Sequence, residues 1–241
     1  SYLGYPGTMA SNCIDYLVAD RTLIPEENKK FYTEKIIYMP NTYQVNDPTL
    51  KVSKKKFERK ELGLPDNGIV FCCFNQNYKI LPDMFSIWIE IIKKVENSVL
   101  WLMSDNPISE TNLKKKFIKN NISENRLIFA SRMPHREHLS RLKLADIFLD
   151  TFPYNAHTTA SDALRVGLPV VTLKGQSFAS RVASSLLNSL DLNELITNSD
   201  NEYKKLAIKI AENLSLLQEI KKKIKDNISN KPLFDAKLFT Q

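Results

Sequence analysis

From residue 69 onward, short unbroken apolar segments alternate with segments whose apolar residues recur at helical spacing. The apolar segments have the length of strands and cover Ile69 to Phe74, Ser98 to Met103, Arg126 to Ala130, Asp146 to Asp150 and Pro169 to Leu173. Helices are expected at 82–95, 109–120 and 135–144, from 158 onward, and at 177–190. Strands that are apolar on both faces and alternate with helices indicate a parallel sheet covered on both sides. The predicted fold is therefore α/β, a Rossmann-like doubly wound parallel sheet.

The rest of the chain divides into a loop-rich beginning, a basic linker and a helical end. Residues 1–50 are rich in proline, contain one strand-like segment from Lys35 to Met39, and are interpreted as the end of a larger unit. Residues 51–66 carry a cluster of Lys and Arg and are predicted to link this part to a domain at 67–241. An apolar stripe predicts two more helices, at 200–212 and 213–228. Because the chain begins at Ser1 without an initiator Met, we interpret it as a fragment or a processed chain.

The composition excludes several classes of protein. The 3 Cys form neither a disulfide framework nor a CxxC metal pattern, so we expect a cytoplasmic location and no metal site. No apolar run reaches the roughly 18 to 20 residues that span a bilayer, and we expect no export signal. The net charge of +7 favours polyanions in general, but no aromatic residues alternate with the lysines as base stacking requires. We therefore expect neither nucleic acid nor membrane as a partner.

Polar residues suited to binding an anion follow two of the predicted strands at the point where each ends. In an open parallel sheet, ligands bind at this edge. Gln76 and Lys79 follow the first strand, and a lysine there can act as a point charge on phosphate. Thr158 and Thr159 begin the helix after the fourth strand, where hydroxyls, free N–H groups and the helix dipole together form an anion site. Plain N-capping by these threonines with Asp162 is the alternative. Convergence of these groups on one edge favours a pyrophosphate ligand.

All three histidines of the chain lie near the same predicted edge. His135, His138 and His157 fall at the starts of two successive helices. Each alone is compatible with a structural role, but together they favour a binding site. The His135-x-x-His138 spacing differs from the usual helical metal pair, and no Cys joins it, so metal ligation is a weak explanation. Arg141 lies one turn beyond His138 and is positioned to support it or to reach a base.

Several familiar motifs are absent from the sequence. It contains neither GxGxxG nor GxxxxGK[ST], which disfavours NAD-dependent dehydrogenases and P-loop NTPases. It also lacks the GxSxG motif of hydrolases. Binding of a diphosphate by side chains and a helix N-terminus, without a glycine fingerprint, is typical of nucleotide-sugar glycosyltransferases of the two-lobed GT-B kind.

Six segments carry a resemblance to a known family. They are Leu3 to Thr8, Phe71 to Ile80, Asn97 to Leu102, Leu144 to Thr151, His157 to Asp162 and Ala179 to Ala183. In order and spacing they resemble the O-linked N-acetylglucosamine (O-GlcNAc) transferases that modify Ser and Thr of intracellular proteins, and their bacterial relatives. The resemblance implies that residues 1–50 end the N-terminal catalytic lobe. It also implies that residues 67–241 form the C-terminal lobe of a GT-B glycosyltransferase.

The resemblance further implies a set of donor-binding residues. These are Leu3, Gly4, Pro6, Gln76, Lys79, His135, His138, Arg141, His157, Thr158, Thr159 and Asp162. Within this set, Gln76 and Lys79 would meet the diphosphate, with Lys79 catalytic because it stabilises departing UDP. The two threonines would bind phosphate oxygens, and His157 would line the donor pocket.

Three further roles follow from the same resemblance. His138 and Arg141 would pack near the uracil, and Asp162 would hydrogen-bond the ribose. The segment containing Leu3, Gly4 and Pro6 would border the sugar. One departure concerns the ribose, because His135 stands where the animal enzyme has a lysine that contacts it.

The implied activity is inverting, metal-independent transfer of N-acetylglucosamine from UDP-GlcNAc to Ser/Thr hydroxyls of proteins, without a cofactor. The family's catalytic histidine and its tetratricopeptide (TPR) repeats lie outside these residues, so the chain alone is expected to bind UDP weakly and transfer nothing. The alternatives are a UDP-sugar-binding module without turnover, a transferase that uses another donor such as GDP-fucose, a nucleotide-sugar epimerase of the same architecture, and a nucleic-acid binder. His157 and Gln76 favour UDP-GlcNAc over GDP-fucose.

Overall fold

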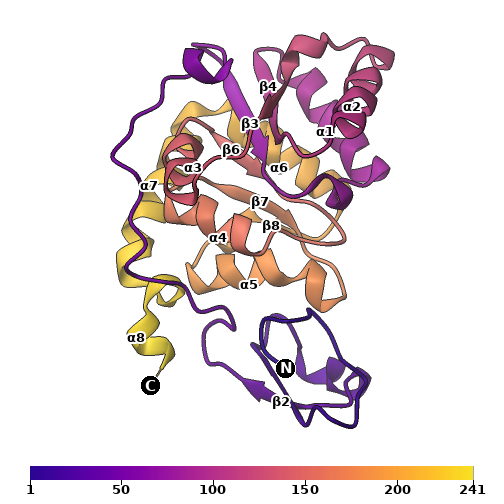
Figure 1. Cartoon of the computed structure of the whole chain (residues 1–241), viewed down its shortest axis with the longest axis vertical. Helices are drawn as coiled ribbons and strands as arrows, with labels where there is room; N and C mark the ends of the chain where they lie inside the picture. Colours follow the sequence, from indigo (N-terminus) through magenta and orange to yellow (C-terminus); the bar gives the residue numbers. More distant parts are fainter. Residues whose placement is uncertain (241) are drawn as a thin grey trace.

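A six-stranded, wholly parallel sheet forms the centre of the computed structural model, which describes residues 1–240 (Figure 1). Its strands are β3 (Ile69–Cys73), β4 (Ser98–Met103), β5 (Leu127–Ala130), β6 (Ile147–Leu149), β7 (Val170–Leu173) and β8 (Ile196–Thr197). They lie in the order β5-β4-β3-β6-β7-β8, and every neighbouring pair is parallel. The α/β doubly wound prediction is therefore confirmed.

Helices cover both faces of this sheet (Figure 1). They are α1 (Pro82–Lys94), α2 (Pro107–Lys119), α3 (His135–Leu142), α4 (Thr158–Arg165), α5 (Val182–Ser189), α6 (Asp200–Glu212), α7 (Leu214–Asn230) and α8 (Ala236–Phe239). On one face, Trp88 of α1 donates a hydrogen bond to Tyr203 of α6 (3.1 Å), and Phe85 packs against Phe117 of α2. Helices α3, α4 and α5 adjoin one another on the opposite face. Among residues 1–240, no helix has both the length and the apolar character needed to cross a bilayer.

The single helix predicted at 177–190 is wrong in its first part. Residues Phe178–Ser180 form a short 3-10 turn, and α5 begins only at Val182. Ser177 and Ser180 cap each other, and Arg181 donates from Nε to the carbonyl of Gly175 (2.8 Å), so the chain turns back before the α-helix starts. The apolar residues of the turn and the helix merge into one pattern in the sequence, which hides the break.

The strand order reverses between β3 and β6. From β3 the chain builds outward to β4 and β5, whereas from β6 it builds the other way to β7 and β8. The carboxyl ends of β3 and β6 therefore flank a switch point, where ligands of doubly wound folds bind. Asn75, after β3, donates a hydrogen bond to the Thr151 hydroxyl, after β6, at 2.7 Å. The two loops are joined directly at this edge.

Residues 1–50 form a separate small unit built on β1 (Tyr16–Ala19) and β2 (Lys35–Tyr38), which pair in parallel (Figure 1). Only the second of these strands was expected. The buried carboxylate of Asp20 accepts hydrogen bonds from the Tyr43 backbone and from Ser185 of α5. Asn46, also buried, bonds the Ser161 hydroxyl of α4 and the carbonyl of Leu233. Buried polar contacts thus attach this unit to the main sheet domain.

The first part of the basic linker contacts α3, and the linker later contains a short 3-10 helix at Lys60–Leu62. Ser53 N–H donates to the Arg136 carbonyl (3.0 Å), and the Ser140 hydroxyl donates to the Lys55 carbonyl (2.6 Å). Further along, the Arg59 guanidinium pairs with Asp146 at 2.8 Å. Part of the linker's positive charge is therefore structural.

Candidate functional site

A cavity of about 310 Å³ opens at the switch point. Its lining consists of Phe74, Gln76, Met103, Arg132, Met133, His135, His138, Arg141, Thr159 and Asp162. The structure therefore brings together Gln76 after β3, both histidines and the arginine of α3, and two residues of α4. This is half of the donor-binding set that the sequence suggested, placed at the ligand edge of the sheet.

Arg141 and His138 form a buried pair on one wall of this cavity. Arg141 is 1% exposed; its Nε donates to Nδ1 of His138 (2.9 Å), and its guanidinium lies 5.1 Å from the Phe74 ring. Burial and the nearby arginine charge lower the pKa of His138 to about 4, so the imidazole is neutral at neutral pH. Because Nδ1 accepts from an arginine, the imidazole proton resides on Nε2. His138 is consequently a hydrogen-bond donor at the cavity wall.

His135 and Asp162 join α3 to α4 across the cavity. His135 Nε2 lies 2.8 Å from Asp162 Oδ2. Burial raises the pKa of Asp162, and its contact with His135 opposes this shift. The two residues expected at the ribose therefore bind each other in this structure. Both also line a second, adjoining cavity of about 420 Å³, so the pair lies between the two spaces.

Helix α4 begins at the candidate site without a side-chain cap. His157 is the N-cap residue and makes no capping hydrogen bond, so the alternative in which Thr158 or Thr159 caps the helix is wrong. Instead, the Thr159 hydroxyl donates to Oδ1 of Asn75 (2.5 Å), which joins α4 to the loop after β3. Thr159 lines the 310 Å³ cavity, whereas Thr158 lines the adjoining one. The first N–H groups of α4 therefore donate no hydrogen bond to a capping side chain of their own helix.

Lys79 faces the loop that precedes α4. Its ammonium donates to the Asn155 carbonyl (3.1 Å) and lies 3.8 Å from the centre of the Tyr154 ring. Burial lowers its pKa, and the charge of Asp150 opposes this shift. Lys79 lies outside the linings of both cavities. Lys79 and the two threonines were expected to face one common phosphate site. They do not do so in this structure, because the Lys79 ammonium donates its hydrogen bond to the Asn155 carbonyl.

His157 lies beside this lysine. Its ring stacks on Tyr154 with the ring centres 5.0 Å apart, and its Nε2 is buried with no hydrogen-bond partner among residues 1–240. Burial, reinforced by the charge of Lys79, lowers the pKa of His157 to about 4. A neutral imidazole with one unused nitrogen is thus placed directly at the start of α4.

The buried carboxylate of Asp150 holds the loop between β6 and α4. Its Oδ1 accepts from the N–H groups of Thr151 (2.8 Å) and Ala156 (2.6 Å), and its Oδ2 accepts from the Thr172 hydroxyl (2.6 Å). Complete burial raises its pKa to about 7 despite these donors. Asp150 therefore fixes the loop whose Asn155 carbonyl receives Lys79.

The N-terminal residues expected at the sugar lie on the surface. Leu3 and Gly4 are exposed and Pro6 is partly exposed, and all three lie outside the lining of the 310 Å³ cavity. Their segment is held by the buried carboxylate of Glu34, which accepts from the Thr8 hydroxyl at 2.7 Å.

Sequence reasoning assigned no role to three residues that organise the site. Asn75 connects Thr151 to Thr159, Asp150 holds the loop, and Tyr154 lies under Lys79. A polar residue directly at the end of a buried strand was the available signal for Asn75 and Asp150. The sequence gives no such signal for Tyr154, because an aromatic residue in a loop is compatible with many different structural roles. Among the described residues, no cluster of three His, Cys, Asp or Glu side chains suits a metal ion.

The chain matches known proteins over its whole length. The family model described as glycosyl transferase family 41 matches residues 1–58 and 54–241. A probable UDP-N-acetylglucosamine–peptide N-acetylglucosaminyltransferase (SEC) of Arabidopsis thaliana is 36% identical over 98% of this chain and 25% of its own length. The corresponding Caenorhabditis elegans transferase is 36% identical over 75% of this chain and 16% of its own length. The chain thus spans a quarter or less of these curated relatives.

Solved structures agree with this match. A mutant of the Thermobaculum terrenum O-GlcNAc transferase superposes with a TM-score of 0.87 and 27% identity, over 99% of this chain and 45% of that one. HepE of Anabaena, solved in complex with UDP, has a TM-score of 0.62 and 17% identity over 86% of this chain and 56% of its own, which shows a common fold. The resemblance seen in the sequence is confirmed, and the chain belongs to glycosyl transferase family 41.

Proposed function

We propose that the protein containing this chain transfers N-acetylglucosamine from UDP-GlcNAc to Ser/Thr hydroxyls of proteins, and that this chain supplies the donor-binding lobe. The observation that carries the proposal is the switch-point cavity, where Gln76, Thr159 and the His138–Arg141 pair converge. The names of the Arabidopsis and nematode relatives support the donor and the peptide acceptor. In this proposal residues 1–50 end the N-terminal lobe, residues 51–66 link it, and residues 67–241 form the C-terminal lobe.

The uridine end of the donor is assigned to the wall formed by α3. The neutral His138 offers an Nε2–H donor, which matches a carbonyl oxygen of uracil. The buried Arg141 fixes the orientation of that ring and is itself held by the Ser131 carbonyl at 2.6 Å. Asp162, opposite, is a hydrogen-bond acceptor for ribose hydroxyls once its contact with His135 is exchanged for the ligand.

The diphosphate is assigned to the start of α4. Its uncapped N–H groups and the positive end of the helix dipole favour an anion. Gln76 and Thr159 lie in the same cavity, and Thr158 lies next to it. Lys79 joins these phosphate-binding groups when its ammonium donates to a phosphate oxygen instead of to the Asn155 carbonyl.

The catalytic contribution of this lobe is stabilisation of the departing UDP. Negative charge develops on the diphosphate as the bond to the sugar breaks, and Lys79 and the α4 N-terminus are positive groups already held near that point. We propose that they make a metal ion dispensable and that His157, neutral and with an unused Nε2, lines the sugar end together with Leu3, Gly4 and Pro6. A cytoplasmic location, with no nucleic-acid or membrane partner, belongs to the same proposal. It is supported by three free cysteines, of which Cys13 is exposed.

The test compares Lys79→Ala with Lys94→Ala, which removes an exposed lysine from α1. In the whole protein, Lys79→Ala is expected to lower the rate of sugar transfer about 100-fold or more, because loss of one preorganised charge costs that much. UDP affinity measured by calorimetry should fall far less, and Lys94→Ala should change neither value.

Two outcomes contradict the proposal. Full transfer activity in Lys79→Ala removes Lys79 from catalysis. Binding of GDP in preference to UDP, or UDP binding with no transfer by the whole protein, indicates another donor or a binding module.

A further inference from the structure

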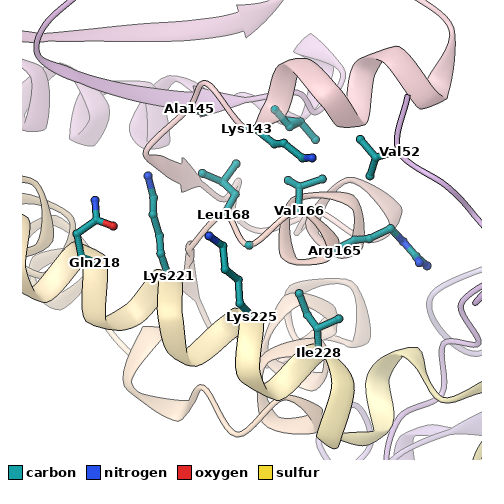
Figure 2. A pocket seen from close by; sticks show the side chains of 12 residues that line it. Val52, Lys143, Ala145, Arg165, Val166, Leu168, Gln218, Lys221, Lys225 and Ile228 are labelled. Atoms are coloured by element: carbon teal, nitrogen blue, oxygen red, sulfur yellow. The ribbon is translucent and has the colours of Figure 1, made fainter. Parts of the chain in front are cut away.

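A third cavity, of about 450 Å³, is shown in Figure 2. Its lining includes segments that precede β6 and β7, so it lies at the opposite edge of the sheet from the switch point. It is formed by Leu142, Lys143 and Ala145, which precede β6, by Arg165 to Leu168, which precede β7, by one face of α7, and by Val52 of the linker. None of the residues assigned to the donor lines it. The lining of this cavity and that of the switch-point cavity share no residue.

Basic side chains dominate the polar lining of this cavity. Lys143, Lys221 and Lys225 extend toward it in Figure 2, and the lining contains neither Asp nor Glu. Lys221 pairs with Asp146 at 3.0 Å, but that carboxylate also binds Arg59. Within residues 1–240, Lys143 and Lys225 have no ion pair and no side-chain hydrogen bond. Two exposed ammonium groups thus lie at the cavity without an ion-pair partner among the described residues.

The fourth cation of the lining has another role. The guanidinium of Arg165 points away from the three ammonium groups in Figure 2, and it lies 4.5 Å from the centre of the Phe234 ring. We therefore assign the charge of the cavity to the three lysines alone.

The lysines are not required as caps for the helices that end here. At the end of α4, Gly167 N–H donates to the Leu164 carbonyl and Leu168 N–H to the Ala163 carbonyl, the pair of bonds that makes a Schellman motif. At the end of α3, the Leu142 carbonyl accepts from the Ala145 N–H at 3.1 Å. These terminal carbonyls already accept from backbone groups, so they do not need Lys143 or Lys225 as hydrogen-bond donors.

The backbone at Gly167 sets the path of Lys225. Gly167 has a φ of +82°, and a side chain there would meet the aliphatic part of Lys225 at 3.3 Å. The lysine stem therefore lies across the glycine, with its ammonium group left at the cavity. Val52, Val166 and Ile228 supply apolar walls around the charged groups.

We propose that this cavity binds a small phosphate-bearing ligand. Ammonium groups act as point charges that suit phosphate oxygens, and an anion lowers the mutual repulsion of lysines that face one concave site. The apolar walls suit the organic part of a phosphate ester. Because the site is separate from the switch-point cavity, the inference does not depend on the identity of the sugar donor.

The experiment titrates the chain with inorganic pyrophosphate and follows backbone amide signals by NMR. The amides of Lys143 and Gly167 report on the lysine-lined cavity, and that of Thr159 reports on the switch-point cavity. We expect saturable shifts at Lys143 and Gly167. Lys225→Met keeps the unbranched stem over Gly167 but removes the charge, and it should weaken this binding about ten-fold or more. Lys222→Met removes an exposed lysine from the same helix outside the cavity, and it should change the affinity less than about two-fold.

The proposal is overturned by three results. The first is the absence of saturation at Lys143 and Gly167 up to about 10 mM pyrophosphate. The second is an equal loss of affinity in Lys225→Met and Lys222→Met, which would indicate attraction to net charge alone. The third is a shift confined to Thr159. Thermal unfolding of each variant verifies its fold, and Lys143→Met provides an independent second variant with the same expected loss.

Discussion

Asp150 is a carboxylate held without water beneath the loop of the candidate site. Two backbone N–H groups and the Thr172 hydroxyl bond it, yet burial raises its pKa to about 7 from an ordinary value of 3.8. The protonated form is therefore favoured by folding. Its contribution to stability is fully present below about pH 4 and is lost as the pH rises through about 7.

Asp150→Asn is expected to remove this pH dependence. The amide keeps nearly the same shape and cannot ionise, so the variant should gain stability relative to the wild type as the pH rises from about 4 to 7, with no further gain above. His138 and His157 act in the opposite sense, since their pKa values are lowered to about 4, but they are common to both proteins. Urea unfolding at several pH values measures the difference, and exposed Asp66→Asn is the control. A difference that does not vary with pH would show that Asp150 does not titrate in this range.

At the scale of elements, the alignment of β3 with β4 depends on a close backbone approach. Gly68 has a φ of +104°, and a methyl group there would overlap the carbonyl oxygen of Asn97. That same carbonyl accepts the Ile69 N–H at 2.9 Å as β3 begins. Gly63, one turn earlier, also has a positive φ of +69°, but nothing lies within 4 Å of the place a methyl would take. A side chain at Gly63 would meet only backbone strain, whereas one at Gly68 would meet both backbone strain and steric overlap.

Alanine at these two positions should therefore have unequal costs. Gly63→Ala is expected to lower the free energy of unfolding by about 1 kcal/mol, the cost of a left-handed non-glycine residue. Gly68→Ala adds displacement of the Asn97 carbonyl and should cost about 3 kcal/mol or more. Chemical denaturation of both variants measures the costs. Equal losses would mean that the β3–β4 junction shifts to accept a methyl group without strain.

At the scale of the whole molecule, residues 1–50 are attached to the sheet domain by buried polar contacts. The Ser185 hydroxyl of α5 donates to Asp20, whose burial raises its pKa. Asn46 bonds to α4 and to the Leu233 carbonyl near the end of the chain. The aromatic ring of Tyr2 also stacks on Phe239. Residues distant in sequence thus hold residues 1–50 against the sheet domain.

Ser185→Ala should loosen this attachment. Removing one donor from a buried carboxylate is expected to cost about 1–3 kcal/mol, and amide hydrogen exchange should accelerate in β1 and β2. Ser189→Ala is the matched control, because it removes a buried hydroxyl from the same helix whose only bond is local, to the Leu186 carbonyl. If both variants accelerate exchange equally in β1 and β2, the Asp20 contact does not hold the two parts together.

The sequence alone was sufficient to predict the five longer strands of the central sheet, from β3 to β7, and most of the helices that cover it. Strands such as Ile69–Cys73 are buried on both faces, so their apolar runs are unbroken and distinctive. The two-residue strand β8 and the edge strand β1, with Tyr16 exposed, carry too little pattern to be found. The edge at which the polar residues gather followed from the strand ends, because all strands of a parallel sheet point the same way.

Only the tertiary structure decided which side chains meet. The Lys79 ammonium binds the Asn155 carbonyl, His135 pairs with Asp162, and Asn75 joins Thr159, across sequence separations of 76, 27 and 84 residues. Local sequence determines which segments form strands and helices. The partner of a long polar side chain depends instead on which groups lie near it once all the elements have packed. The local periodicity of the sequence therefore determines at which edge of the sheet the site lies. The hydrogen bonds and ion pairs within the site are determined only by the folded structure.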